Sequence, residues 1–227
     1  MITVVSWKWA RPNHGHRLAH VCDYTAEHVN VWSRMVRRNL TIPHRIVCVT
    51  DDPVGITECD TYPCPPIALG GGCYHRLWEY SPGFSRCAGK RFLRMDLDCV
   101  ITGNIDHIAG RAEPFVINRY IYPDKEGQYY NGALVLMDTG ARAQVWNDFH
   151  PIRTPQRVKA NRYTVGSDQA WTAIKLGPGE ATFGPEHGIY EAKKIGKRLP
   201  GNASIVFFSG ARDPSERRWP WVMEHWV

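Results

Sequence analysis

Two carboxylates at the end of an apolar segment are the residues in this sequence best suited to chemistry. Asp96 and Asp98 follow the run RFLRM at 91–95 and open onto LDCVITGNID. Side chains two residues apart on an extended chain point to the same side, so both carboxylates can reach one hard cation. A divalent ion held there can bridge two phosphates and stabilise a nucleotide diphosphate as a leaving group. Surface turns also contain D-x-D by chance, so the pattern needs further support.

Alternating strands and helices are expected to position this pattern. Apolar, β-branched runs predict strands at 2–7, 45–50, 91–96, 115–118, 133–138 and 205–208. Helices are predicted at 25–40, 74–80, 140–149 and 168–176. The Pro- and Gly-rich segment 59–72 predicts an irregular loop at the border of the site. This alternation indicates an α/β fold with a mostly parallel central sheet and helices on both faces.

Length and composition predict one soluble domain. The 227 residues fit a single core, and 43% hydrophobic with 22% charged residues exclude disordered, collagen-like and coiled-coil classes. The chain shows neither a signal-peptide pattern nor the roughly 18 apolar residues of a membrane span. Seven cysteines without a zinc-type pair favour reduced thiols. We therefore expect a cytoplasmic protein, with peripheral membrane contact left open.

The formal charge of +6 favours anionic partners. Nucleotide diphosphates, acidic glycans, anionic membranes and nucleic acids all satisfy that condition. The basic residues are spread along the chain without a helix-turn-helix pattern or an RNA-type aromatic motif. We expect no specific nucleic-acid binding.

The order of motifs resembles that of family 8 glycosyltransferases and of related short bacterial and phage proteins. The segment MDLDCVITGNIDHI at 95–108 is similar to the family's D-x-D, small-residue turn and helix start. Further similar segments are YHRL at 74–77, YNGALVLM at 130–137, SDQA at 167–170 and FSG at 208–210 with Pro214. The resemblance implies a single GT-A-like, Rossmann-like domain, with 1–98 mainly nucleotide-binding and 99–227 mainly acceptor-side and C-terminal loop.

The resemblance also implies roles for individual residues. Asp96 and Asp98 would hold Mn²⁺ or Mg²⁺ and the donor diphosphate, and Arg76 would contact phosphate. Around the transferred sugar and the C-terminal loop it implies Asn131, Asp168, Gln169 and Gly210, and Arg212 is added there as a candidate for donor binding. Three of these residues have an ordinary alternative: Arg76 as a surface cation, Asn131 as a turn residue, and Asp168 as a helix N-cap.

Two strand ends supply further candidates for the nucleotide base and ribose. Trp7 and Lys8 end the first predicted strand, and Asp51 follows the second. The carboxyl ends of parallel strands are where α/β sheets bind ligands. A plain loop role suits these three residues almost as well.

The C-terminal motif departs from the family pattern. Phe207 stands where the family places a metal-binding His, Ser209 where some relatives have one, and Asp213 where the pattern has a phosphate-binding Lys. The metal site would then lack its third protein ligand. Arg212, Arg217 and Arg218 are the candidates for the missing positive charge.

The function implied is transfer of a sugar from a nucleotide-sugar donor, most simply UDP-linked, with retention of configuration. The acceptor, whether glycan, lipid-linked glycan or protein, is not identified by the sequence. One alternative is a non-catalytic nucleotide-sugar or glycan-binding protein, motivated by the altered C-terminal motif. The other is a metal-dependent nuclease or nucleotidyltransferase, which needs more acidic residues than one D-x-D.

Overall fold

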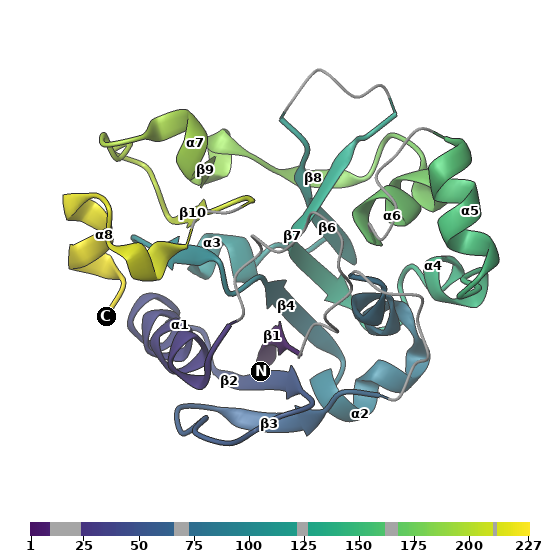
Figure 1. Cartoon of the computed structure of the whole chain (residues 1–227), viewed down its shortest axis with the longest axis horizontal. Helices are drawn as coiled ribbons and strands as arrows, with labels where there is room; N and C mark the ends of the chain where they lie inside the picture. The colour runs from purple at the N-terminus through teal and green to yellow at the C-terminus, as the bar shows by residue number, and fades with distance from the viewer. Residues whose placement is uncertain (10–23, 66–72, 122–126, 162–167, 211–212) are drawn as a thin grey trace.

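A seven-stranded sheet forms the centre of the computed structural model, which describes residues 1–9, 24–65, 73–121, 127–161, 168–210 and 213–227 (Figure 1). The strands are β1 (Ile2–Lys8), β2 (His44–Thr50), β3 (Asp60–Pro63), β4 (Arg91–Met95), β6 (Phe115–Arg119), β7 (Tyr130–Asp138) and β8 (Ala181–Phe183), in the order β3-β2-β1-β4-β7-β6-β8. Strand β7 runs antiparallel to β4 and β6, and the other neighbours are parallel. The predicted α/β fold with a mostly parallel sheet is confirmed.

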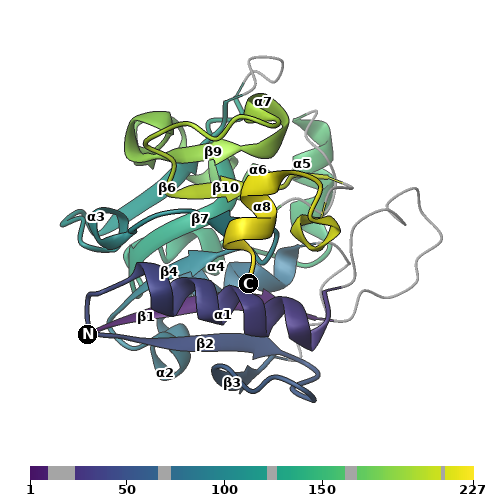
Figure 2. The same cartoon turned by 90° about the vertical axis from the view of Figure 1, so that its left-hand side faces the viewer.

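Helices cover both faces of the sheet. Helix α1 (Ala26–Asn39) lies on one face, and α4 (Gln144–Asn147), α5 (Arg153–Ala160) and α6 (Asp168–Leu176) lie on the other (Figures 1 and 2). Successive residues of β1 alternate between two cores: Val4 packs in the cluster that contains Trp32, and Val5 in the cluster that contains Trp171. The period of two in a strand therefore gives the sheet a hydrophobic core on each side.

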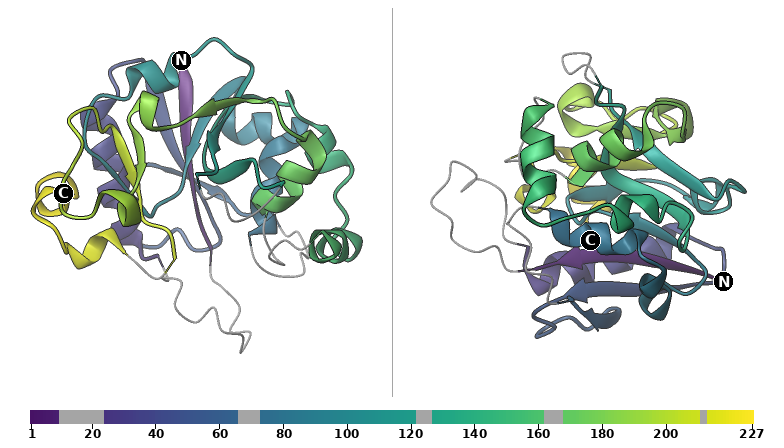
Figure 3. Two further views of the ribbon diagram at one scale, coloured as in Figure 1. Left: turned by 90° about the horizontal axis from the view of Figure 1, so that it is seen from above. Right: turned by 90° about the vertical axis from the view of Figure 1, so that its right-hand side faces the viewer.

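A second, three-stranded sheet adjoins helix α1. Its strands β5 (Cys99–Ile101), β10 (Ile205–Phe207) and β9 (Ile189–Glu191) lie in the order β5-β10-β9, with β10 antiparallel to β5 and parallel to β9. Strand β5 contacts both α1 and α8 (Pro220–His225), which lie on the same side of the molecule when it is viewed from above (Figure 3). This sheet brings the C-terminal segment back to the D-x-D region.

Several elements differ from the sequence prediction. The segment 59–72 is not wholly irregular, because Asp60–Pro63 forms the edge strand β3; an edge position tolerates Pro63, which lacks an N–H. The predicted helix at 140–149 shortens to α4, preceded by Gly140 with φ of 84°. The segment 74–80 forms the 3-10 helix η1 (Tyr74–Tyr80). Helix α3 (Asp106–Ala109) begins where the resemblance places a helix start. Short elements that were not predicted include η2 (Pro82–Phe84), α2 (Ser85–Ala88), η3 (Pro185–His187), α7 (Ala192–Ile195) and η4 (Pro214–Glu216).

The cysteines and the helix lengths can be described for the part of the chain that the structure covers. Cysteines 48, 59, 64, 73, 87 and 99 form no disulfide bond within the described residues, and Cys22 lies outside them. None of the helices in the described ranges has the length and apolar character needed to cross a bilayer.

Candidate active site

Four chain segments meet at the carboxyl edge of β4. Asp96 directly follows β4, and its backbone N–H donates to the carbonyl of Ala133 in β7 at 3.0 Å. Because β7 is antiparallel to β4, its first residues lie at this same edge. Helix α6 begins here at Asp168, and β9 ends here at Glu191. Carboxyl edges of this kind are the ligand-binding edges of α/β sheets.

A buried ion-pair cluster joins Arg76 to two of the predicted carboxylates. The Arg76 guanidinium donates to Oδ1 of Asp96 and, at 3.0 Å, to Oδ1 of Asp168; its Nε lies 2.9 Å from Oδ2 of Asp168. Only 8% of Arg76 and 5% of Asp168 is exposed. Although burial opposes ionisation, the negative charges of Asp168 and Asp96 raise the pKa of Arg76 well above its ordinary value. The surface-cation alternative for Arg76 is therefore excluded.

A second arginine, which the sequence reasoning missed, supports Asp96 from the interior. Arg94 binds Glu79 through two parallel hydrogen bonds of 3.0 Å, and both side chains are almost wholly buried. Its Nη1 also donates to Oδ1 of Asp96 at 3.2 Å and to the carbonyl of Gly132. The sequence signal that could have revealed this pair is the presence of charged residues within the otherwise apolar segments RFLRM and YHRLWEY.

Gly132 and Gln169 join β7 to α6 beside this cluster, and Asn131 bonds the backbone of its own strand. The Oε1 of Gln169 accepts from the Gly132 N–H at 3.0 Å, and Oδ1 of Asn131 accepts from the Ala133 N–H at 2.8 Å. A Cβ on Gly132 would lie 3.4 Å from the Gln169 Cβ and 3.7 Å from Nη2 of Arg76. A side chain larger than alanine would therefore displace its neighbours.

Glu191 and Lys193 are two further residues that the sequence reasoning missed. Glu191 is 3% exposed, its Oε1 accepts from Asn131 Nδ2 at 3.2 Å, and burial raises its pKa to about 7 despite the opposing effects of Ser209 and Lys193. Burial, Asp96 and Glu191 raise the pKa of Asp98 well above its ordinary value. A single charged residue in the short run GIYEA gave no usable signal.

The structure brings Trp7, Lys8 and Asp51 to the neighbouring strand ends. Lys8 donates to the Asp52 carbonyl at 2.9 Å, whereas Asp51 is exposed. Trp7 is 4% exposed and stacks on Phe84 with ring centroids 6.3 Å apart. Trp7 is therefore mainly a packing residue at this edge.

The C-terminal loop differs from the arrangement expected for phosphate binding. Arg212 lies outside the described residues, Arg217 lies over the Trp226 ring at 5.7 Å, and Arg218 bonds Glu216 at 3.0 Å. Gly210 has φ of 84°, and a Cβ there would lie 3.3 Å from Nζ of Lys193. Lys193 is thus the described cation next to the glycine of the motif.

Phe207 and Asp213 have structural roles. Phe207 is 2% exposed within the hydrophobic core. Asp213 lies 3.1 Å from His28 Nε2 and accepts from the Ser215 N–H at 2.7 Å. Burial opposes ionisation of Asp213, but these hydrogen bonds outweigh it and lower the pKa to about 2.

The acidic residues described at this edge offer oxygen ligands to a cation, but they are not gathered around one point. Within the described ranges, no three His, Cys, Asp or Glu side chains form a group that can hold a metal. Asp98 and Glu191 have raised pKa values, chiefly because both carboxyl groups are buried. Hard oxygen ligands and an excess of negative charge suit Mn²⁺ or Mg²⁺, with Asp96 and Asp98 as the pair that would hold it.

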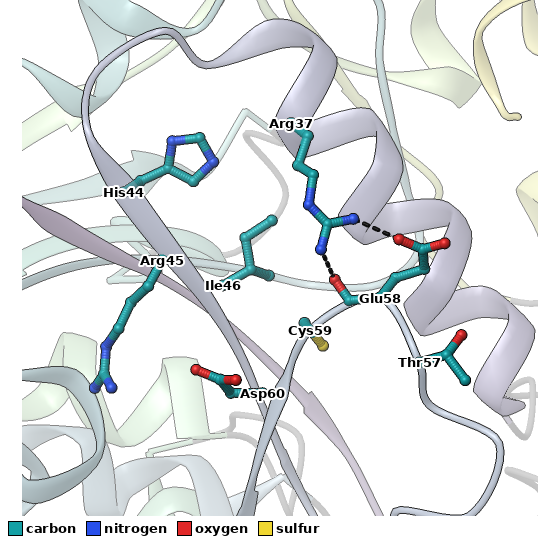
Figure 4. A pocket seen from close by; sticks show the side chains of 8 residues that line it. All are labelled: Arg37, His44, Arg45, Ile46, Thr57, Glu58, Cys59 and Asp60. Carbon is teal, nitrogen blue, oxygen red and sulfur yellow. Dashed lines mark hydrogen bonds and ion pairs between the residues drawn. The ribbon is translucent and has the colours of Figure 1, made fainter.

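A polar groove of about 370 Å³ lies at the opposite edge of the sheet (Figure 4). It is lined by Arg37, His44, Arg45, Ile46, Thr57, Glu58, Cys59 and Asp60. These include the first residues of β2 and β3, and Arg37 is hydrogen-bonded to Glu58. The groove is therefore remote from the carboxyl ends where Asp96 and Lys8 lie.

Comparison with known proteins identifies the fold. No protein-family model and no curated protein matches the chain. The galactosyltransferase LgtC, in complex with donor and acceptor sugar analogues, matches with a TM-score of 0.62 at 9% identity, over 95% of this chain and 90% of LgtC. An active-site mutant of LgtC matches over the same 95% and 90% at 10% identity and a TM-score of 0.62. The glycosyltransferase GlyE of Streptococcus pneumoniae TIGR4 matches with a TM-score of 0.60 at 11% identity, over 93% of this chain and 56% of GlyE. The chain therefore has the GT-A-type fold of these glycosyltransferases.

Proposed function

We propose that this protein is a glycosyltransferase that moves a sugar from a nucleotide-sugar donor to an acceptor. The observation that carries the proposal is the buried cluster of Asp96, Arg76 and Asp168 at the ligand-binding edge of a GT-A-type fold. A UDP-linked donor and retention of configuration follow from the resemblance to family 8. Residues 1–98 would bind mainly the nucleotide, and 99–227 mainly the acceptor, within one domain.

Positive charge near the diphosphate is the main contribution that we assign to the chain itself. Negative charge develops on the leaving diphosphate in the transition state, and preorganised cations stabilise it most effectively. Arg76, held by two carboxylates, and Lys193, beside Gly210, are the described cations placed for this role. Arg212, which lies outside the described residues, remains a candidate for the same role.

Binding of the sugar is assigned to the first residues of β7 and α6. Asn131 and Gln169 present amide groups, and Asp168 presents a buried carboxylate, at one edge of the sheet. Such groups orient sugar hydroxyls through hydrogen bonds whose partners are already fixed. Lys8 and Asp51 would contact the base or ribose, and Trp7 would support that region by packing.

A divalent cation held by Asp96 and Asp98 would supply further neutralisation of the diphosphate charge when bound. The seven cysteines without a zinc-type pair support a cytoplasmic location, where nucleotide sugars would be the donors. The acceptor would be a glycan, a lipid-linked glycan or a protein.

A non-catalytic nucleotide-sugar-binding protein is the second candidate, favoured by Phe207 in the place of the family's His. Thermal unfolding in the presence of UDP, GDP, CMP and their sugars separates a binder from a protein without a nucleotide site. Both candidates require that UDP with Mn²⁺ raises the unfolding temperature of the wild-type protein and not that of Asp96→Asn. Absence of stabilisation by any nucleotide would contradict both.

A further inference from the structure

Helix α5 carries three cations that no described carboxylate neutralises. Arg153, Arg157 and Lys159 are all exposed, and none of them forms an ion pair with a described residue. Each carboxylate of residues 138–180 is paired with a cation outside α5: Asp138 with Arg91, Asp148 with Lys175, Asp168 with Arg76 and Glu180 with Arg142. The sequence from 149 to 167 contains no Asp or Glu. The positive charge of α5 is therefore not balanced by its neighbours in the described chain.

The side chains of α5 divide between a buried face and an exposed face. Thr154 and Val158, four residues apart, are buried on one face, whereas the three cations are exposed. The Arg157 guanidinium lies over the Trp171 ring of α6, 5.4 Å from its centroid, and this contact restrains its position. Helix α5 packs against α6 at one side of the molecule (Figures 1 and 3). Its exposed face therefore presents positive charge to a partner outside the chain.

An exposed apolar residue lies next to these cations in the chain. Ile152, which directly precedes α5, is 66% exposed, and Pro151 before it is exposed as well. Helices that lie on membrane surfaces combine basic and apolar side chains, because the cations meet anionic headgroups while the apolar groups enter the boundary of the acyl chains. Neither a free phosphate ion nor a DNA backbone offers an apolar region to Ile152. The combination of charge and apolar surface therefore favours a lipid bilayer as the partner.

We propose that Ile152 and the exposed face of α5 form a docking surface for an anionic lipid bilayer. Each Lys or Arg near an anionic membrane surface strengthens binding by about fivefold, so three cations together contribute about a hundredfold. Docking of this kind does not depend on the proposed glycosyl transfer. Because α5 packs against α6, which begins at Asp168, the bilayer would lie on the half of the chain that we assign to the acceptor.

Co-sedimentation of the full chain with lipid vesicles measures this binding directly. The vesicles are either pure phosphatidylcholine or equal parts of phosphatidylcholine and phosphatidylglycerol. The wild-type protein should bind the anionic vesicles, less strongly at raised salt, and should not bind the neutral ones. The triple variant Arg153→Gln, Arg157→Gln, Lys159→Gln should bind the anionic vesicles about a hundredfold more weakly than the wild type. Ile152→Ser should bind them several-fold more weakly, because it removes the apolar contact.

A charge-matched control separates a local surface from the overall charge of the protein. The variant Lys194→Gln, Lys197→Gln, Arg198→Gln removes the same charge from exposed residues in and after α7, which lies well apart from α5 in Figure 1. It should bind the anionic vesicles like the wild type. A second test variant, Arg153→Gln with Lys159→Gln, leaves the contact between Arg157 and Trp171 intact and should still bind at least about tenfold more weakly. Circular dichroism and thermal unfolding check that each variant is folded.

Several results would overturn the assignment of this surface to a membrane. Wild-type protein that binds neither kind of vesicle, or both kinds equally, contradicts it. So does an equal loss of binding in the control and in the folded double variant. Release from the vesicles by inorganic phosphate, but not by chloride at the same ionic strength, would indicate a site for a small anion. Double-stranded DNA that binds more tightly than the vesicles, through the same residues of α5, would indicate a nucleic-acid surface instead.

Discussion

Replacing Glu79 with glutamine removes the charge that balances Arg94 in the interior. Glu79 is 0% exposed and Arg94 1%, and two hydrogen bonds of 3.0 Å join them. Removing one partner of a buried pair typically costs about 3–5 kcal/mol, because the other charge stays buried. Arg94 would still donate hydrogen bonds to Asp96 at 3.2 Å and to the Gly132 carbonyl. We therefore expect the free energy of unfolding to fall by about 3 kcal/mol, near the low end of that range.

The loss is measurable by urea and thermal unfolding. For a chain of this size, 3 kcal/mol corresponds to a fall in the unfolding temperature of roughly 6–12 °C. The matched control is Glu216→Gln, whose partner Arg218 is 55% exposed; it should change stability by less than about 1 kcal/mol. The double variant Glu79→Leu with Arg94→Met should lose less than the sum of the single changes, because no buried charge is left unpaired. A loss below about 1 kcal/mol for Glu79→Gln, or additive effects in the cycle, would refute this reasoning.

Four other outcomes follow from the structure. Asp96→Asn and Asp98→Asn should each abolish Mn²⁺-supported UDP binding in calorimetry. Neither change should unfold the protein, since Arg76 remains paired with Asp168 and Arg94 with Glu79. Unchanged UDP affinity in both variants would show that D-x-D is not part of the site. Lys193→Gln should weaken UDP binding more than Lys194→Gln if Lys193 contacts phosphate beside Gly210; equal affinities would contradict that contact. The fall in the pKa of Asp213 from 3.8 to about 2 stabilises the native state by about 2 kcal/mol above pH 4, and this stabilisation is lost as the pH falls towards 2. Asp213→Asn should therefore unfold more easily than the wild type at pH 7, and the difference in stability between the two proteins should disappear near pH 2. DNA should bind only weakly and with a steep salt dependence, whereas tight binding at raised salt would favour the nuclease alternative.

The central sheet was predictable because its strands are apolar and β-branched. The runs 2–7, 45–50 and 91–96 became β1, β2 and β4, and the helical period at 25–40 became α1. Short elements were not predictable in the same way. Strands β5, β8 and β9 have three residues each, too few to display a period of two, and they form through pairing with distant segments.

Residues of the candidate site were predictable where a sequence motif identifies them. They were not predictable where only contacts in the tertiary structure bring them to the site. The D-x-D pattern and its neighbours pointed to Asp96, Arg76 and Asp168, which the structure joins in one ion-pair cluster. The roles of Glu79 and Glu191 depend on contacts across 15 and 60 residues, with Arg94 and Asn131. No local pattern records such contacts. The metal-binding and donor-binding roles themselves stay predictions.

Turnover of a nucleotide sugar is the most direct measure of the proposed activity. Wild-type protein with Mn²⁺ would be incubated with a panel of UDP-, GDP- and CMP-sugars, with and without sugar acceptors, and release of the nucleotide would be followed. Our account predicts nucleotide release from a UDP-sugar by the wild type, and its loss in a folded Asp96→Asn variant. No release from any donor, despite UDP binding, would leave only a nucleotide-sugar-binding protein. Release that persists unchanged in Asp96→Asn would contradict the assignment of this site.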